Sequence, residues 1–381
     1  MNKLNGTQIV VGEPVPYDCY DGHGNLLLKK GLVVDTQKQV DFLLERGLFG
    51  QPGAASAVVE VIKPDDRPPT PFELLSHYNN RLKQLFSMLS PDPGADKEPD
   101  VSSFPERLLQ LAVDLQKLCH LDADAILGAI HLDSSGRYSV MHPMYRAALC
   151  ELLAARKAIP EADRVWIIAA ALTCDLSMLK LQEDLFRQNE PLQPEQQQAI
   201  KAHPMATAKI LVSCGVNNGT WMNAVIQHHE LLNGKGYPRG LALSDISGAA
   251  RILKLADMYT AMITPRSYRK AMLSKTAMRD IFLKRGSEID EELAVYIVKE
   301  LGVYPPGAFV KLQSGELAIV THRGVNPKAP DVKAVVGPRG APFDKPLLRK
   351  TDIREYEILD VVERDMIVKI DLHKLWGYDA K

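Results

Sequence analysis

The sequence is poor in cysteine and has no cysteine pattern typical of a disulfide framework or a zinc site. Its 381 residues include five cysteines, an odd and scattered set without C-x-x-C spacing. They are Cys19, Cys119, Cys150, Cys174 and Cys214. We therefore expect reduced thiols, as in a cytoplasmic protein.

Segments that direct a protein into or through a membrane are also missing. No uninterrupted apolar run approaches the roughly 20 residues that a membrane span needs. Residues 1–6 contain no apolar core of a secretory signal. We expect a cytoplasmic protein without a membrane span.

Neither sign of charge is in excess. Charged residues make up 24% of the chain and the net charge is -1, so there is no whole-chain basic field for a nucleic acid polymer and no acidic excess typical of disorder. A small anionic ligand needs only a few local cations, and this class of partner stays open. The hydrophobic content of 46% is enough for a substantial core in two or three domains.

The first 62 residues are predicted to form a β-rich unit. Apolar segments at 8–11 and 25–28 flank the string DGHG at 21–24, which is a strong turn signal. A short amphipathic helix is expected at about 36–46. The prolines of residues 63–70 then indicate a linker.

Helical patterns dominate from residue 71 to residue 302. We expect a connecting helical region over 71–135, with helices at 72–89 and 104–119, and a helical domain over 136–302. The segment 164–172 is apolar nearly all round, which predicts a central, buried helix.

The pattern changes to strands after residue 302. Residues 309–312 and 317–320 surround a serine-glycine turn, which predicts a hairpin, and residues 332–336 and 366–370 add strand candidates. A β-rich extension is therefore expected over 303–381. The predicted fold class is mainly α, with β-rich parts at both ends.

Two adjacent histidines, His228 and His229, are the first candidates for chemistry. Neighbouring residues on a helix project about 100° apart, so the pair can serve two metals, or one metal and a nearby partner. Gly234 and Gly236 follow and allow the chain to bend sharply beside a ligand. Taken alone, adjacent histidines are also typical of surface or structural positions.

Two carboxylates lie in apolar helical surroundings. Asp175 ends the run 169–175 and Asp257 ends the run 251–257, where an ionised carboxylate is costly unless it is paired or metal-bound. With His203 and the histidine pair they fit a binuclear site for Mn, Fe or a similar metal. For either aspartate singly, a helix cap or a salt bridge is the alternative.

The order and spacing of these residues resemble the signature of HD-GYP domains. The matching strings are QHHE (227–230), NGKGYPRGL (233–241), ARIL (250–253), DMY (257–259) and RSYRKA (266–271), with PLQPE (191–195) and HP (203–204) upstream. The resemblance covers roughly residues 141–302. It implies an all-helical domain that hydrolyses the phosphodiester bonds of cyclic-di-GMP with two or three metals.

The same resemblance implies roles for individual residues. The metal ligands it implies are His142, Cys174, Asp175, His203, His228, His229 and Asp257. Catalytic roles are implied for Asp175 and Glu230, and ligand-binding roles for Gly236, Tyr237, Arg266 and Arg269. The implied cofactor is a divalent metal, Fe or Mn, as one or two ions. The implied partner is a cyclic dinucleotide, with protein signalling partners as a further class.

Three positions depart from the family pattern. Cys174 replaces the histidine of the His-Asp pair, Met178 replaces a lysine expected just after it, and Tyr138 stands where three-metal members place a glutamate. We therefore expect no third metal. Cys174 is either a thiolate ligand or a small residue that fills the core.

These departures leave several functions open. The chain is a phosphodiesterase weakened by the two losses, or a catalytically inactive module that binds cyclic-di-GMP or a protein partner. Hydrolysis of another phosphate ester is a third possibility, because a fold does not fix a substrate.

Overall fold

The computed structural model describes residues 67–89, 101–133, 136–267, 269–364 and 370–378, together with four short strands nearer the N-terminus. The chain divides into two compact units, Met1–Pro68 and Pro69–Lys381. This division falls within the segment 63–70 that the prolines mark as a linker.

In the first unit the short strands form one sheet in the order β1-β4-β2-β3. Their bounds are Asn2–Lys3 (β1), Cys19–Tyr20 (β2), Leu26–Leu28 (β3) and Phe49–Gly50 (β4). Strands β2 and β3 pair antiparallel on either side of the predicted turn at 21–24. The predicted strand at 8–11 and helix at 36–46 lie outside the described residues.

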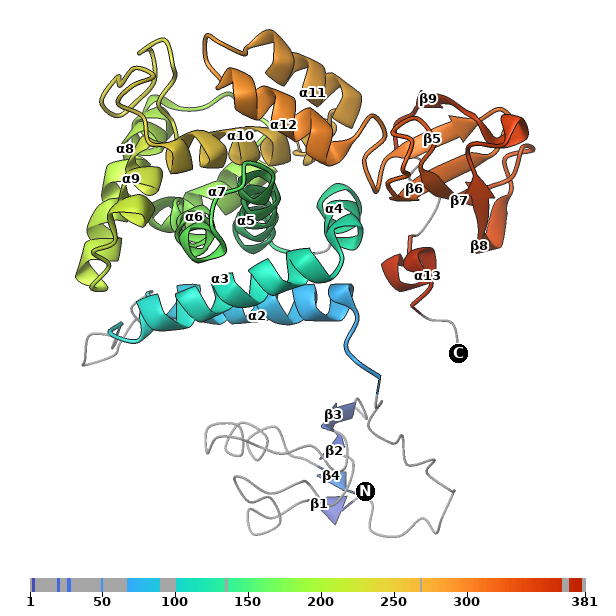
Figure 1. The fold of residues 1–381 in the computed structure, drawn as a ribbon. Coiled ribbons are helices and arrows are strands. Elements are labelled where there is room, and N and C mark those ends of the chain that lie inside the picture. The colour runs from blue at the N-terminus through green and yellow to red at the C-terminus, as the bar shows by residue number, and fades with distance from the viewer. Residues whose placement is uncertain are drawn as a thin grey trace. The chain divides into compact units, whose positions relative to one another are not determined.

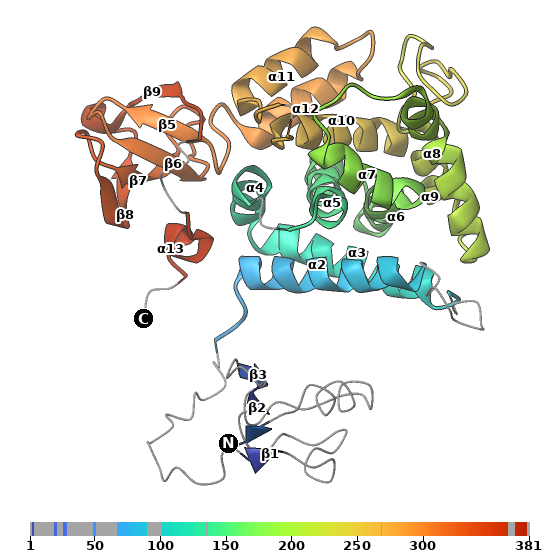
Figure 2. The same ribbon diagram turned by 180° about the vertical axis from the view of Figure 1, so that it is seen from behind.

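The second unit begins with a helical core. Its helices are α2 (Pro71–Met88), α3 (Phe104–Leu121), α4 (Ala123–Leu132), α5 (Tyr138–Arg156), α6 (Glu161–Thr173), the 3-10 turn η1 (Leu176–Met178), α7 (Leu179–Arg187), α8 (Pro194–Ser213), α9 (Gly219–Gln227), α10 (Gly248–Ile263), α11 (Ser274–Leu283) and α12 (Glu291–Leu301). Helices α2 and α3 lie side by side along one side of the core, and α5 and α6 lie between them and α10 (Figures 1 and 2). The expected mainly helical fold is confirmed.

Helices α5 and α6 form the centre of this core. From Tyr138 to Ala154, α5 is buried on every face, and α6 is buried from Ile167 to Thr173. Packing on all sides of the later part of α6 explains why residues 165–172 are apolar nearly all round. The predicted central helix at 164–172 is therefore confirmed.

The stretch Glu161–Arg187 is long and apolar enough to cross a membrane by length and composition. It is not one straight element, because α6, η1 and α7 divide it. The most apolar part of the stretch is 67% buried inside the protein. This behaviour is typical of a core helix.

The C-terminal part forms an antiparallel sheet in the order β8-β7-β6-β5-β9. The strands are β5 (Phe309–Leu312), β6 (Leu317–His322), β7 (Asp331–Val336), β8 (Pro342–Lys350) and β9 (Ile358–Val361), with the 3-10 turn η2 (Arg354–Tyr356) before β9. The predicted hairpin and the strand at 332–336 are confirmed, and most of the candidate at 366–370 lies outside the described residues.

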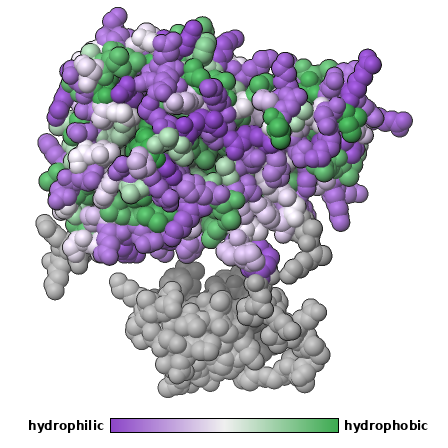
Figure 3. Space-filling view, in the orientation of Figure 1, coloured by the Kyte–Doolittle hydropathy of each residue, from purple (hydrophilic) through white to green (hydrophobic). Residues whose placement is uncertain are grey.

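Polar and apolar contacts attach this sheet to the helical core. Arg323, just after β6, donates to Asp124 of α4 and to Glu300 of α12. Trp376 of the short helix α13 (Leu372–Trp376) packs against Gly128, where a Cβ atom would lie 2.1 Å from the indole ring. On the face shown in Figure 3, hydrophilic residues are interspersed with apolar ones over the second unit.

Candidate metal centre

Five segments of the helical core bring the predicted ligands together. His142 lies on α5, Asp175 follows α6, His203 lies on α8, the pair His228 and His229 follows α9, and Asp257 lies on α10. Their ligand nitrogen and oxygen atoms, together with the sulfur of Cys174, form groups in which all members lie within 4.8 Å of one another. The groups are His203 with His228 and His229, Cys174 with Asp175 and His228, and His142 with Asp175 and Asp257.

A proline inside α8 fixes the orientation of His203. Pro204 has no N–H and leaves the carbonyl of Ile200 without its helical hydrogen bond. Nδ1 of His203 donates to that carbonyl at 2.6 Å. Because a carbonyl oxygen can only accept, the ring proton is on Nδ1, and Nε2 carries a lone pair.

His228 is oriented in the same way by the end of α9. The last carbonyls of a helix lack intrahelical partners, and Nδ1 of His228 donates to the carbonyl of Val225 at 2.7 Å. Metal-binding histidines usually donate their second ring nitrogen to a backbone carbonyl or a carboxylate in this manner. Nε2 of His228 therefore also presents a lone pair.

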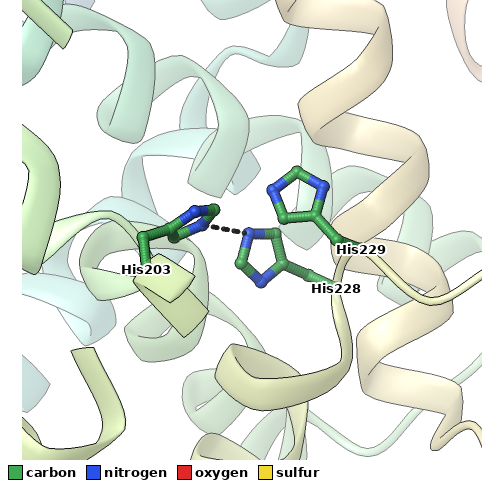
Figure 4. Close-up of side chains that lie close together, drawn as sticks. All are labelled: His203, His228 and His229. Atoms are coloured by element: carbon green, nitrogen blue, oxygen red, sulfur yellow. Dashed lines mark hydrogen bonds between the residues drawn. The ribbon is translucent and has the colours of Figure 1, made fainter. Parts of the chain in front are cut away.

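The two lone pairs point at each other. Nε2 of His203 lies 3.2 Å from Nε2 of His228 (Figure 4), so a hydrogen bond between them requires one ring to be cationic. Burial and the neighbouring His203 lower the pKa of His228 to about 4, which disfavours its cationic form. Two nitrogens that bind one ion at about 2.0–2.1 Å lie about 3 Å apart at ordinary bond angles, so the pair fits a divalent metal.

His229 completes the group of three imidazoles and is half-buried. Its ring stacks on Tyr237, with centroids 4.6 Å apart and planes 17° apart. Tyr237 reaches this place because the chain turns back after α9: its N–H donates to the carbonyl of His229. The aromatic ring limits the rotation of the imidazole.

The glycine-rich turn packs tightly on its own backbone. A Cβ atom at Gly236 would lie 2.3 Å from the backbone nitrogen of Leu231, so the close approach requires glycine. Glu230 is buried, and its two oxygens accept from the backbone N–H groups of Arg239 at 2.7 Å and Leu241 at 2.9 Å. Glu230 thus holds the turn in place, and the catalytic role expected for it stays a prediction.

Arg146, a residue that the sequence analysis missed, lies between the two aspartates. Its side chain is fully buried. Nη1 donates to Oδ2 of Asp175 at 2.6 Å and to Oδ1 of Asp257 at 2.7 Å. The available signal was its position on α5, one helical turn after His142 and therefore on the same face.

Arg146 also determines the charge state of Asp175. Burial acts to raise the pKa of Asp175, but Arg146 and then His203 outweigh it and hold the pKa below its ordinary value. Oδ2 of Asp175 faces Arg146, while Oδ1 lies 3.4 Å from Nε2 of His203. One carboxylate thus connects the arginine with the histidine group.

His142 differs from the other histidines in its hydrogen bonds. Its Nε2 lies 3.0 Å from Oδ1 of Asp257, and because an ionised carboxylate only accepts, this nitrogen carries the proton. Burial acts to raise the pKa of Asp257, but the bond from His142 and the charge of Arg146 hold it well below its ordinary value. Nδ1 of His142 is buried and has no hydrogen-bond partner within the described part of the chain.

Tyr138 connects Arg266 with His142. The Tyr138 ring stacks on His142 with centroids 4.8 Å apart, and Nη2 of Arg266 donates to its hydroxyl at 2.9 Å. Burial raises the pKa of Tyr138 to about 12, which keeps the hydroxyl neutral. Arg269 instead donates to the carbonyl of Ala261 near the end of α10, at 2.7 Å.

Cys174 and Met178 lie at two of the three positions where the sequence is expected to depart from the family pattern. Cys174 directly follows α6 as its C-cap, is fully buried and is part of the apolar core. Its sulfur also lies within 4.8 Å of ligand atoms of Asp175 and His228. Both interpretations of Cys174, as core residue and as ligand, are therefore compatible with its position. Met178 ends η1, where a lysine was expected.

Comparison with known proteins agrees with this geometry. Residues 129–293 match the HD domain family. The cyclic di-GMP phosphodiesterase PA4108 of Pseudomonas aeruginosa is 29% identical over 197 residues, which are 52% of this chain and 47% of that protein. The 3'3'-cGAMP-specific phosphodiesterase 3 of Vibrio cholerae is 31% identical over 174 residues, 46% of this chain and 38% of that protein. The chain carries an HD-GYP domain.

A solved structure supports the fold of the HD-GYP domain and its surroundings. Bd1817, an HDG"Y"P protein from Bdellovibrio bacteriovorus, aligns with a TM-score of 0.52 at 14% identity, over 78% of this chain and 98% of that one. The alignments with the two curated relatives span about half of their length or less. The curated relatives that resemble this domain are named as cyclic di-GMP or 3'3'-cGAMP phosphodiesterases.

Proposed function

We propose that the HD-GYP domain is a metal-dependent phosphodiesterase that linearises a cyclic dinucleotide, with cyclic-di-GMP as the first candidate. The proposal rests above all on the two Nε2 lone pairs of His203 and His228, which converge at 3.2 Å in a buried site. A divalent ion held there would acidify a bound water, so that hydroxide is available at neutral pH. The names of the relatives suggest the substrate class.

The open side of the site determines where a substrate can approach. His203, His228 and Asp175 are buried, whereas His229 is half-buried and the Asp257 side chain is 21% exposed. A phosphodiester would therefore reach the centre from the side of His229 and Asp257.

Asp175 would accept a proton during the reaction, and Arg266 would bind the phosphate. Arg146 fixes one oxygen of Asp175, and the other oxygen faces His203, where it can accept a proton from an attacking water. Arg266 donates to the hydroxyl of Tyr138, whose ring stacks on His142, and guanidinium groups bind phosphate oxygens through paired hydrogen bonds. The reaction adds water across one P–O bond and releases the linear dinucleotide.

A second function is binding of the cyclic dinucleotide without hydrolysis. Two features favour it: the single guanidinium of Arg146 contacts both carboxylates of the centre and offsets one of their two charges, and Met178 lies where the family resemblance predicts a lysine. A site that binds fewer metal ions and lacks the lysine would stabilise the transition state less than a complete family site. Retained binding with no turnover would be the result.

One experiment separates these functions. The full chain is loaded anaerobically with Mn(II) or Fe(II) and incubated with cyclic-di-GMP or with 3'3'-cGAMP. Linear product is measured by chromatography, and binding is measured by calorimetry. Product from either dinucleotide supports the phosphodiesterase, and binding without product supports the second function.

A histidine variant and a matched control connect the activity to the site. His228→Ala should abolish turnover and lower the bound metal. His77→Ala changes an exposed histidine of α2 and should leave both unchanged. If neither dinucleotide is bound or cleaved by the metal-loaded chain, both functions are wrong.

A further inference from the structure

We propose that the guanidinium of Arg146 takes the place of a metal ion between Asp175 and Asp257, so that the domain binds one metal per chain, at His203, His228 and His229. The proposal concerns the number and position of the ions, and it stands whether or not a dinucleotide is hydrolysed.

One nitrogen of Arg146 bridges the two aspartates. Nη1 of Arg146 contacts carboxylate oxygens of both aspartates, at 2.6 and 2.7 Å. Together with His142 these carboxylates form one of the groups that could hold an ion. A cation that bridges two carboxylates at contact distance already supplies the charge that an ion would bring.

The backbone of α6 holds the guanidinium in this place. Nε and Nη2 of Arg146 both donate to the carbonyl of Ala171 on α6, at 3.0 and 2.8 Å. The side chain has no exposed surface, and a guanidinium stays charged in proteins. Moving Arg146 aside would leave the buried carboxylate of Asp175, the partly buried carboxylate of Asp257 and the carbonyl of Ala171 without this partner, which is strongly unfavourable.

The charges of this group also favour the guanidinium over a second ion. Two carboxylates and one guanidinium sum to a single negative charge, whereas the same carboxylates without the guanidinium would carry two. A divalent ion added next to Arg146 would meet a fixed positive charge at close range in a poorly screened interior. The ion and the guanidinium therefore compete for the same two carboxylates.

His142 is oriented differently from the histidines of the three-histidine group. Its Nε2 is protonated and points to Asp257, and its Nδ1 is buried without a hydrogen-bond partner in the described residues. His203 and His228 show the opposite arrangement, with Nδ1 bonded to a backbone carbonyl and Nε2 free to bind an ion. The hydrogen bonds thus prepare the three-histidine group for a metal and the His142 group for the arginine.

The test is the metal content of the purified chain after loading with excess Mn(II) and removal of unbound ions. We expect one ion per chain in the wild type. Arg146→Ala should raise the content towards two, and Arg146→Lys, which keeps a cation, should leave it at one. Two ions per wild-type chain, or one ion per folded Arg146→Ala chain, would overturn the proposal.

Arg164→Ala is the matched control. Arg164 is also a buried arginine that pairs with a carboxylate, Glu151, but it lies outside the candidate metal groups. Its loss should lower stability without changing the metal content. An increase in metal content in this variant as well would mean that loosening of the core, rather than vacating the site, admits the ion.

Electron paramagnetic resonance gives a readout that does not need a folded variant. Mn(II) in the wild type should give the spectrum of isolated ions, and a spectrum of two coupled ions would contradict the proposal. These measurements use no substrate. Failure of the hydrolysis assay and failure of the single-metal proposal can therefore be told apart.

Discussion

The aromatic ring of Tyr237 lies flat on the imidazole of His229, with centroids 4.6 Å apart. Tyr237 belongs to the glycine-rich turn, so this contact joins the turn to the histidine group. Aromatic pairs are worth about 0.5–1.5 kcal/mol beyond their buried area. The stack is therefore expected to affect how well His229 is placed for a metal.

We predict that Tyr237→Ala weakens Mn(II) binding by a factor of about 2 to 10, the equivalent of that stacking free energy. Tyr237→Phe keeps the ring and should bind the metal like the wild type. Titration calorimetry with Mn(II) measures both. Weaker metal binding in the phenylalanine variant would show that the hydroxyl, rather than the stack, matters.

Gly236→Ala should disrupt the turn. The added Cβ atom would lie 2.3 Å from the nitrogen of Leu231 and 2.4 Å from the Cα of Glu230, and neither backbone atom can move aside as a flexible side chain would. We expect a loss of stability of about 1–3 kcal/mol, typical of overpacking. Thermal unfolding is the measurement.

The control for this variant is Gly248→Ala. Gly248 begins α10, and a Cβ atom there meets no other atom within 4 Å. The midpoint of unfolding should stay the same or rise slightly, because alanine favours a helix more than glycine does. Equal midpoints for the two alanine variants would contradict the predicted clash at Gly236.

Glu230→Gln tests whether this carboxylate holds the turn or takes part in chemistry. Both oxygens of Glu230 accept backbone hydrogen bonds, and an amide nitrogen cannot accept one. We expect a loss of about 1–3 kcal/mol of stability, because one of the two backbone N–H groups then loses its acceptor on the buried side chain. Faster proteolysis within residues 231–245 should accompany it.

A different outcome would restore the role expected from the sequence. If Glu230→Gln unfolds at the wild-type temperature and resists proteolysis equally well, but turns over substrate far more slowly, then Glu230 acts in catalysis. The two measurements together decide between the roles.

The extent to which the site could be predicted differs between its parts. The histidine pair and the turn after it are contiguous in sequence, and Glu230 bonds to residues 9 and 11 positions further on. Such local patterns keep their spacing and can be recognised directly. The helical core could also be predicted, since α6 is apolar on nearly every side and buried on most of its length.

Arg146 could not be predicted in the same way. Its carboxylate partners lie 29 and 111 positions away, and an arginine within a helix is usually exposed. Burial of its guanidinium depends on how α5, α6 and α10 pack together, and the sequence of α5 alone does not contain that information. The orientation of His203 could be predicted only in part. Pro204 is visible in the sequence, but the hydrogen bond from His203 to the carbonyl of Ile200 is seen only in the structure.

Cys174 gives the last prediction. Its thiol is fully buried in the apolar core, and the three-histidine group can hold an ion without it. We expect Cys174→Ser to keep the metal content of the wild type and to lose about 1–3 kcal/mol of stability, because a buried hydroxyl needs a hydrogen-bond partner. Cys174→Ala introduces no such group and should also keep the metal. A lower metal content in both variants would instead identify Cys174 as a ligand, and the single ion would then lie nearer to Asp175 than we propose.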